Sequence, residues 1–201
     1  MTSGHPRPAL SAICAIVAIA AAEAFGSAAF AQTLDPAELL AALARVARST
    51  ATFEETRTMA ALTTPIVRRG TLRYVRPDQL EMVVRTPVPE RIEINGDSVT
   101  FESRSGTKRV RLTQFPAAAA WVESVRATLA GDQQALHRYF RVRVTGRMAA
   151  WTLELIPFDN ELADLVSRIA ITGTEDQLTR IDIDERGGDR SVMVITAIDR
   201  R

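Results

Sequence analysis

Residues 70–84 read GTLRYVRPDQLEMVV, and this stretch decides the fold. Apolar and polar side chains alternate on both sides of Pro77, which is the pattern of strands with one face toward apolar surroundings. Since proline cannot donate to the ladder of a sheet, the chain breaks at Pro77 and returns. Leu72 and Tyr74 share one face of the first strand, and Leu80 opens the matching face of the second. The stretch therefore predicts two antiparallel strands with a common apolar face.

The same alternation extends in both directions, from Thr52 to Thr113. Asn95-Gly96-Asp97 and Ser105-Gly106 predict hairpin turns within it, and Gly187-Gly188 predicts another near the end of the chain. Strands resume after the middle of the sequence, at 142–144, 151–155, 165–173, 178–184 and 192–198. The pattern predicts about eleven strands in an antiparallel arrangement, apolar on one face and charged on the other.

Two segments predict helices. Residues 35–38 read DPAE, which is a helix start with a capping side chain, a proline in the first turn and an acid. Apolar residues then recur at helical spacing as far as Ser49. Residues 116–131 predict a second helix, and 132–140 a short third one. A long sheet curls because adjacent strands rotate by about 20–25°, and its concave face needs a cover. We therefore expect a mainly β, α+β fold, a curled antiparallel sheet or unclosed β-barrel covered by an N-terminal helix and a central helical lid.

The first 31 residues predict a secretory signal peptide. Arg7 precedes an apolar run from Ala9 to Ala22, and Ala29-Phe30-Ala31 fits the small-x-small pattern before a cleavage site. The run is shorter than the about 20 residues that a membrane-spanning helix needs. We therefore expect an exported, periplasmic protein whose residues 32–201 form one domain.

The composition argues against an enzyme. Cys14 is the only cysteine, and His137 is the only histidine after residue 31. This excludes cysteine chemistry and the usual zinc sites, and His137 is better explained as a surface or capping residue. Acids at 182, 184 and 185 are expected on the solvent face of a strand, because their spacing does not match a calcium loop. With 25 basic and 24 acidic residues, the charge gives no reason to expect nucleic acid. No catalytic residue, metal or cofactor is expected.

The Gly-x-Leu-x-Tyr-x-Arg-Pro run at 70–77, the strand opened by Leu80, the hairpin at 94–97 and the central helices resemble the periplasmic outer-membrane lipoprotein carrier family, the LolA-like proteins. The resemblance covers essentially the whole chain after the predicted signal peptide. Val99 and Phe101 follow the hairpin where the family usually has a Trp-x-Tyr pair, so the chain resembles a divergent branch.

The resemblance implies a carrier that shelters the acyl chains of a lipoprotein or other lipid in a hydrophobic cavity and ferries it from the inner towards the outer membrane. Its partners would be an inner-membrane exporter and an outer-membrane acceptor, and the protein is expected to be a monomer. Arg76 matches the family's arginine that holds the lid by hydrogen bonds to backbone. From the residues alone, Arg76 either stands at the edge of the apolar cup or points outward at the strand end.

The central helix carries an apolar stripe that either faces the cavity or belongs to permanent core. With the strand residues, it completes the expected lining of the cavity: Leu72, Tyr74, Leu80, Met82, Val84, Ile92, Ile94, Val99, Phe101, Trp121, Val125 and Leu129. The alternative function is a non-enzymatic periplasmic module on the same fold that senses lipid or binds a protein. A carrier should exchange bound lipid with membranes, whereas such a module should bind a protein partner.

Overall fold

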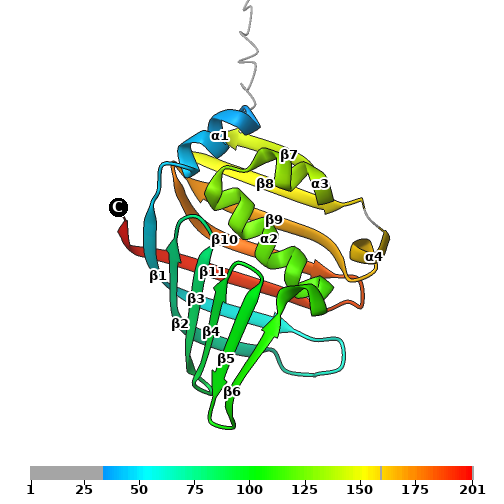
Figure 1. Ribbon diagram of the computed structural model, residues 1–201. Helices are drawn as coiled ribbons and strands as arrows, with labels where there is room; N and C mark the ends of the chain where they lie inside the picture. Colours follow the sequence, from blue (N-terminus) through cyan, green and yellow to red (C-terminus); the bar gives the residue numbers. More distant parts are fainter. Residues whose placement is uncertain (1–33, 159, 201) are drawn as a thin grey trace, which may run out of the picture. The chain divides into compact units, whose positions relative to one another are not determined.

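The computed structural model describes residues 34–158 and 160–200, and the predicted signal peptide lies outside them. Eleven antiparallel strands of this part form one sheet, in the order β6-β5-β4-β3-β2-β1-β11-β10-β9-β8-β7 (Figure 1). The strands are β1 (Arg48–Thr58), β2 (Ile66–Val75), β3 (Gln79–Thr86), β4 (Glu90–Asn95), β5 (Ser98–Ser103), β6 (Gly106–Arg111), β7 (Phe140–Arg147), β8 (Ala150–Pro157), β9 (Val166–Thr174), β10 (Gln177–Glu185) and β11 (Arg190–Arg200). Because β6 and β7 stand at the two ends, the sheet is not closed. The predicted mainly β, unclosed fold is confirmed.

The pairing of β1 with β11 joins two meanders into one sheet. Phe53 lies opposite Ile195 in this pairing and opposite Gly70 of β2 on its other side. Strands far apart in the sequence thus lie side by side at the centre of the sheet. This central pairing brings the apolar face of β10 and β11 next to that of β1 to β4.

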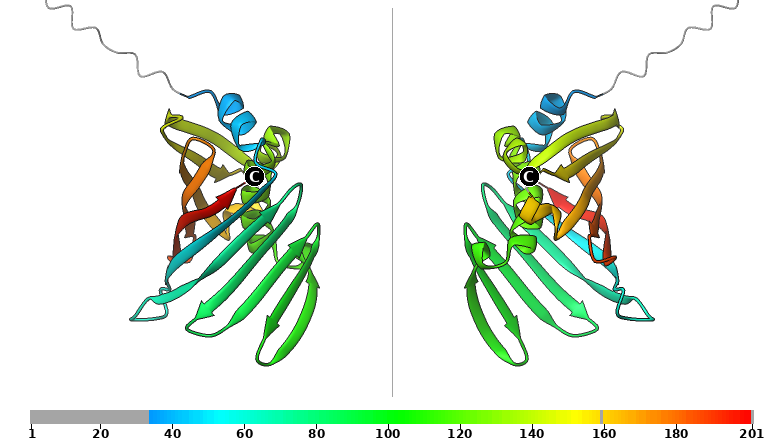
Figure 2. Two further views of the ribbon diagram at one scale, coloured as in Figure 1. Left: turned by 90° about the vertical axis from the view of Figure 1, so that its left-hand side faces the viewer. Right: turned by 90° about the vertical axis from the view of Figure 1, so that its right-hand side faces the viewer.

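The helical segments are α1 (Pro36–Leu43), the 3-10 turn η1 (Leu112–Gln114), α2 (Pro116–Ala130), α3 (Gln133–Tyr139) and the short α4 (Asn160–Ala163). Figure 2 shows α1 and α2 between the two halves of the curled sheet. Local sequence explains their ends. The side chains of Asp35 and Asp132 accept hydrogen bonds from backbone N–H groups at the starts of α1 and α3, and Gly131 ends α2 in the left-handed conformation.

The largest apolar core lies mainly between the helices and the strands β7 to β9, and it extends to Phe53 of β1 and Val84 of β3. Three leucines of α1 are almost fully buried, with Trp151 among the largest side chains beneath them. The core leucines and isoleucines of this layer include Leu39, Leu40, Leu43, Leu153, Leu155, Ile169 and Ile171. This half of the concave face is therefore filled by permanent packing.

Two local predictions were wrong. The first helix was expected to continue to Ser49 and Phe53 to begin the first strand, but α1 ends at Leu43 and β1 begins at Arg48. Arg48 pairs with Val75, so sheet pairing overrides the helical spacing of the apolar residues there.

Asp182 lies on the outer face of β10 as expected, since its neighbour Ile181 lines the cavity, but it is only 6% exposed. Arg180 donates to both of its carboxylate oxygens, at 2.6 and 2.8 Å, and Arg190 donates at 3.0 Å. Burial alone would raise the pKa of Asp182, but the hydrogen bonds from the two arginines outweigh burial and hold this pKa below its ordinary value.

Candidate functional site

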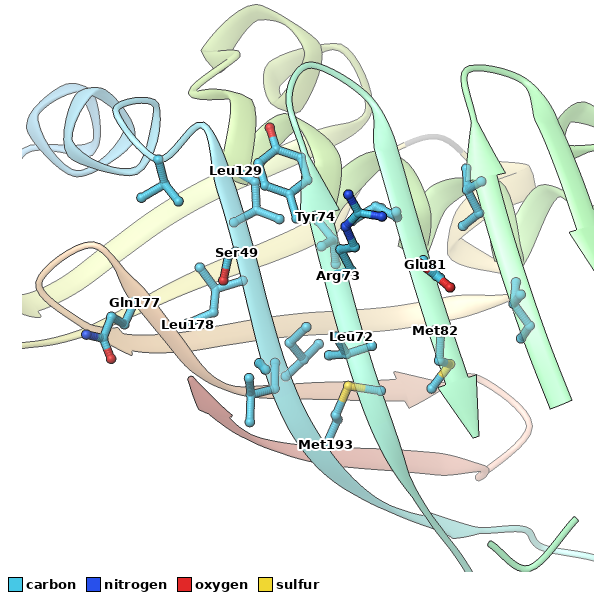
Figure 3. A pocket seen from close by; sticks show the side chains of 18 of the residues that line it. Ser49, Leu72, Arg73, Tyr74, Glu81, Met82, Leu129, Gln177, Leu178 and Met193 are labelled. Atoms are coloured by element: carbon cyan, nitrogen blue, oxygen red, sulfur yellow. The ribbon is translucent and has the colours of Figure 1, made fainter. Parts of the chain in front are cut away.

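An apolar cavity of about 120 Å³ lies between α2 and the concave faces of β1 to β4, β10 and β11 (Figure 3). Aliphatic and methionine side chains make up most of its wall, and unbranched methionine adapts to ligands of different shape. Besides the residues predicted from the sequence, the apolar lining includes Val46, Ala51, Leu178, Ile181, Met193 and Ile195.

The structure brings most of the sequence-predicted residues together in this cavity. Those that line it are Leu72, Tyr74, Leu80, Met82, Ile92, Ile94, Val125 and Leu129. Val84 belongs instead to the main core, and Val99 to a smaller cluster with Leu112 and Val122. Phe101 is 40% exposed and is not part of the lining. The side chain of Trp121 lies outside what the structure describes.

Both interpretations of the α2 stripe hold in part. Val125 is only 6% exposed and belongs to the main core, yet it also lines the cavity together with Leu129. The helix therefore serves as core on one side and as cavity wall on another. A shift of α2 would change the cavity volume and the core at once.

One end of the cavity is formed by Tyr74, which pairs with Ser49 across β1 and β2. The Tyr74 hydroxyl donates to the carbonyl oxygen of Pro77 at 3.4 Å. Burial raises the pKa of Tyr74 above its ordinary value, so this hydroxyl stays protonated. The phenol thus presents its ring to the cavity and its polar atom to the turn that follows β2.

Arg76 stands at this end of the domain and bonds to α1 instead of the central helix. Its guanidinium donates to the carbonyl oxygen of Ala44, and its backbone N–H donates to the carbonyl oxygen of Ala47 at 3.0 Å. The lid clamp expected on the central helical segment therefore reaches the C-terminal end of α1.

Ala44 also touches the end of α2, so a single residue joins Arg76 to both helices. A Cβ atom added to Gly131 would lie 2.7 Å from the Ala44 Cβ and 2.7 Å from the Leu40 carbonyl oxygen. Such an approach is possible only for glycine. Arg76 therefore contacts α1, α1 contacts α2, and α2 covers the cavity.

The described residues offer little for other kinds of site. No group of three or more metal-ligating side chains is found among them. His137 is exposed on α3, with one ring nitrogen 3.4 Å from the amide nitrogen of Gln133. Each helix in residues 34–158 and 160–200 falls short of the length or apolar character needed to cross a bilayer.

The fold is thus an unclosed antiparallel half-barrel with helices over an apolar cavity. Residues 28–199 match the family described as outer membrane lipoprotein carrier protein LolA-like, and the chain belongs to this family. The resemblance noted from the sequence is thereby confirmed.

Two solved structures are similar over most of their length. A LolA superfamily protein from Nitrosomonas europaea is 11% identical with a TM-score of 0.46, and the match covers 84% of this chain and 93% of that one. A DUF1329 family protein from Desulfovibrio piger is 10% identical with a TM-score of 0.42, covering 81% of this chain and 89% of that one. Among curated proteins no sequence matches.

Proposed function

We propose that this protein is a periplasmic carrier that shelters the acyl chains of a lipoprotein or other lipid and ferries it from the inner towards the outer membrane. The observation that supports this proposal is the apolar cavity beneath α2, in a chain of the LolA-like family. Aliphatic and methionine walls suit hydrocarbon, and the proposed role needs no catalytic group.

A carrier must release its cargo as well as bind it. Each methylene that leaves water contributes about 0.8 kcal/mol, so a rigid pocket would hold a long chain too tightly for transfer. A cover that must be displaced lowers the apparent affinity by the fraction of open protein. We assign this role to α1 and α2, held at Ala44 by Arg76.

The size of the cavity supports a moving cover. The cavity of about 120 Å³ is small beside pockets for drug-sized ligands, which measure about 300–1,000 Å³. A membrane acyl chain spans half of a hydrocarbon core that is about 30 Å thick, and a lipoprotein or phospholipid carries several chains. Cargo of this kind requires α2 to move away from β2 and β3.

Native mass spectrometry with lipid extraction tests the proposal on the mature protein purified from the periplasm of its own host. We expect co-purifying acyl species, and the extracted lipid names the cargo class. A folded protein that carries no lipid and does not take up added lipid would contradict the carrier. It would favour the alternative, a protein-interaction module that keeps the fold.

A further inference from the structure

The cavity lining stops at the same level on four neighbouring strands. These strands are β1 to β4, and the last lining residue on each is paired with the last one on its neighbour. The four residues are Ala51, Leu72, Met82 and Ile92. The next inward-facing row is not part of the lining and consists of Phe53, Gly70, Val84 and Glu90. On β1 to β4, a side chain of this second row therefore ends the apolar space, whereas on β11 the lining continues through Ile195 and Met193 and ends before Ser191.

Phe53 is the side chain that fills this row. It is only 4% exposed, and a Cβ atom added to Gly70 would lie 3.0 Å from the Phe53 Cε1 atom. The ring thus lies over a position with no side chain of its own. Because Phe53 also registers with Ile195, which lines the cavity, its ring stands directly at the end of the apolar space.

A polar layer lies behind Phe53 on the same concave face. Glu55 is only 5% exposed and accepts hydrogen bonds from Ser191 Oγ at 2.6 Å and from Arg68 Nε at 2.7 Å. An Arg68 nitrogen also lies 4.0 Å from a Glu90 oxygen. Hydrocarbon entering this layer would separate the buried Glu55 carboxylate from its partners without offering hydrogen bonds, which is strongly unfavourable.

We propose that Phe53, backed by Glu55, Arg68 and Ser191, is the end stop that sets the longest acyl chain the cavity accepts. This inference rests on the proposed function. The terminal methyl group of the chain points toward Phe53, and its polar end points toward Ser49 and Tyr74. In Figure 3, Met82 and Met193 lie toward one end of the cavity, and Tyr74 and Leu129 toward the other. Flexible methionines thus surround the last methylenes before the stop.

The test compares wild type with Phe53→Ala, using straight-chain fatty acids of increasing length and isothermal titration calorimetry. Below the limit, each added methylene should tighten binding about fourfold. For wild type, the affinity should stop increasing beyond a certain chain length, which is the length limit. For Phe53→Ala, this length limit should be longer by about two carbons or more. Phe140→Ala is the matched control, because Phe140 is also almost fully buried but lies on β7, none of whose residues lines the cavity. Its limit should equal that of wild type.

Phe53→Leu covers the case in which Phe53→Ala does not fold, and it should lengthen the limit by a smaller step. A folded Phe53 variant with the wild-type limit, or the same shift in Phe140→Ala, would overturn the end stop. So would a wild-type affinity that tightens with every added carbon. If wild type binds no fatty acid at any length, the carrier proposal fails together with the end stop.

Discussion

Gly131→Ala tests whether the contact between α1 and α2 holds the helical cover in place. Gly131 has φ +72°, a conformation that costs an L-residue about 1–2 kcal/mol. The added Cβ would also lie 2.7 Å from both the Ala44 Cβ and the Leu40 carbonyl oxygen, and overpacking of this kind costs about 1–3 kcal/mol. We expect the free energy of unfolding to fall by about 2–5 kcal/mol and Tm to fall by at least about 4 °C.

Thermal and urea unfolding, followed by circular dichroism, measure this change. Gly187→Ala is the matched control, because a Cβ at Gly187 would meet nothing within 4 Å and its φ is not in the left-handed region. That substitution should leave stability unchanged or raise it by about 0.4–1 kcal/mol, since alanine restricts the unfolded chain. If Gly131→Ala unfolds at the same temperature as wild type, α1 does not lie against the end of α2 as the structure has it.

Three further predictions concern the cavity, the clamp and the outer face. Leu80→Glu should weaken binding of a fluorescent fatty acid about tenfold or more while the protein stays folded, because a carboxylate in the wall opposes hydrocarbon; equal affinity would remove Leu80 from the wall. Arg76→Leu should bind cargo but transfer it poorly to acceptor vesicles, and unchanged transfer would refute a clamp at Ala44. The lowered pKa of Asp182 stabilises the fold above the unfolded value of about 3.9, and this contribution disappears as the pH falls through the folded pKa. Asp182→Asn should therefore unfold at a lower urea concentration at pH 7 and lose less stability than wild type on acidification. If both proteins lose the same free energy of unfolding as the pH falls, this prediction is refuted.

Local patterns were sufficient to predict most of the fold. Alternation and turn residues predicted the hairpins at Asn95-Gly96-Asp97, Ser105-Gly106 and Gly187-Gly188, and Gly96 has the positive φ of 56° that a tight turn requires. The end of α1 could not be predicted this way, because Val46 continues the helical spacing while the backbone from Arg48 onward pairs with β2. Such pairing depends on residues about 27 positions away, at Val75, which no local window contains.

Within the sheet, the cavity lining was predicted only on β2 to β4, together with Val125 and Leu129 of α2. Period-two alternation assigned residues such as Leu72 and Met82 to the correct face, but it says nothing about depth along that face. Val84 and Phe101 were therefore grouped with the lining although the first is core and the second is exposed. The opposite wall, with Met193 and Ile181, depends on the pairing of β1 with β11 and stayed invisible in the sequence.

The chain order explains why this barrel stays open and why its cover can move. The sheet ends at β6 and β7, and the segment that connects these two strands consists of η1, α2 and α3. The same residues thus span the gap between the edges and cover the concave face (Figure 1). Because α2 belongs to no strand ladder, moving it would break side-chain packing and the hydrogen bond from Arg126 to the Gly96 carbonyl oxygen, but none of the backbone hydrogen bonds of the sheet. A carrier built in this way can enlarge its cavity for cargo at the cost of packing around Val125 and Leu129, while the eleven strands keep their register.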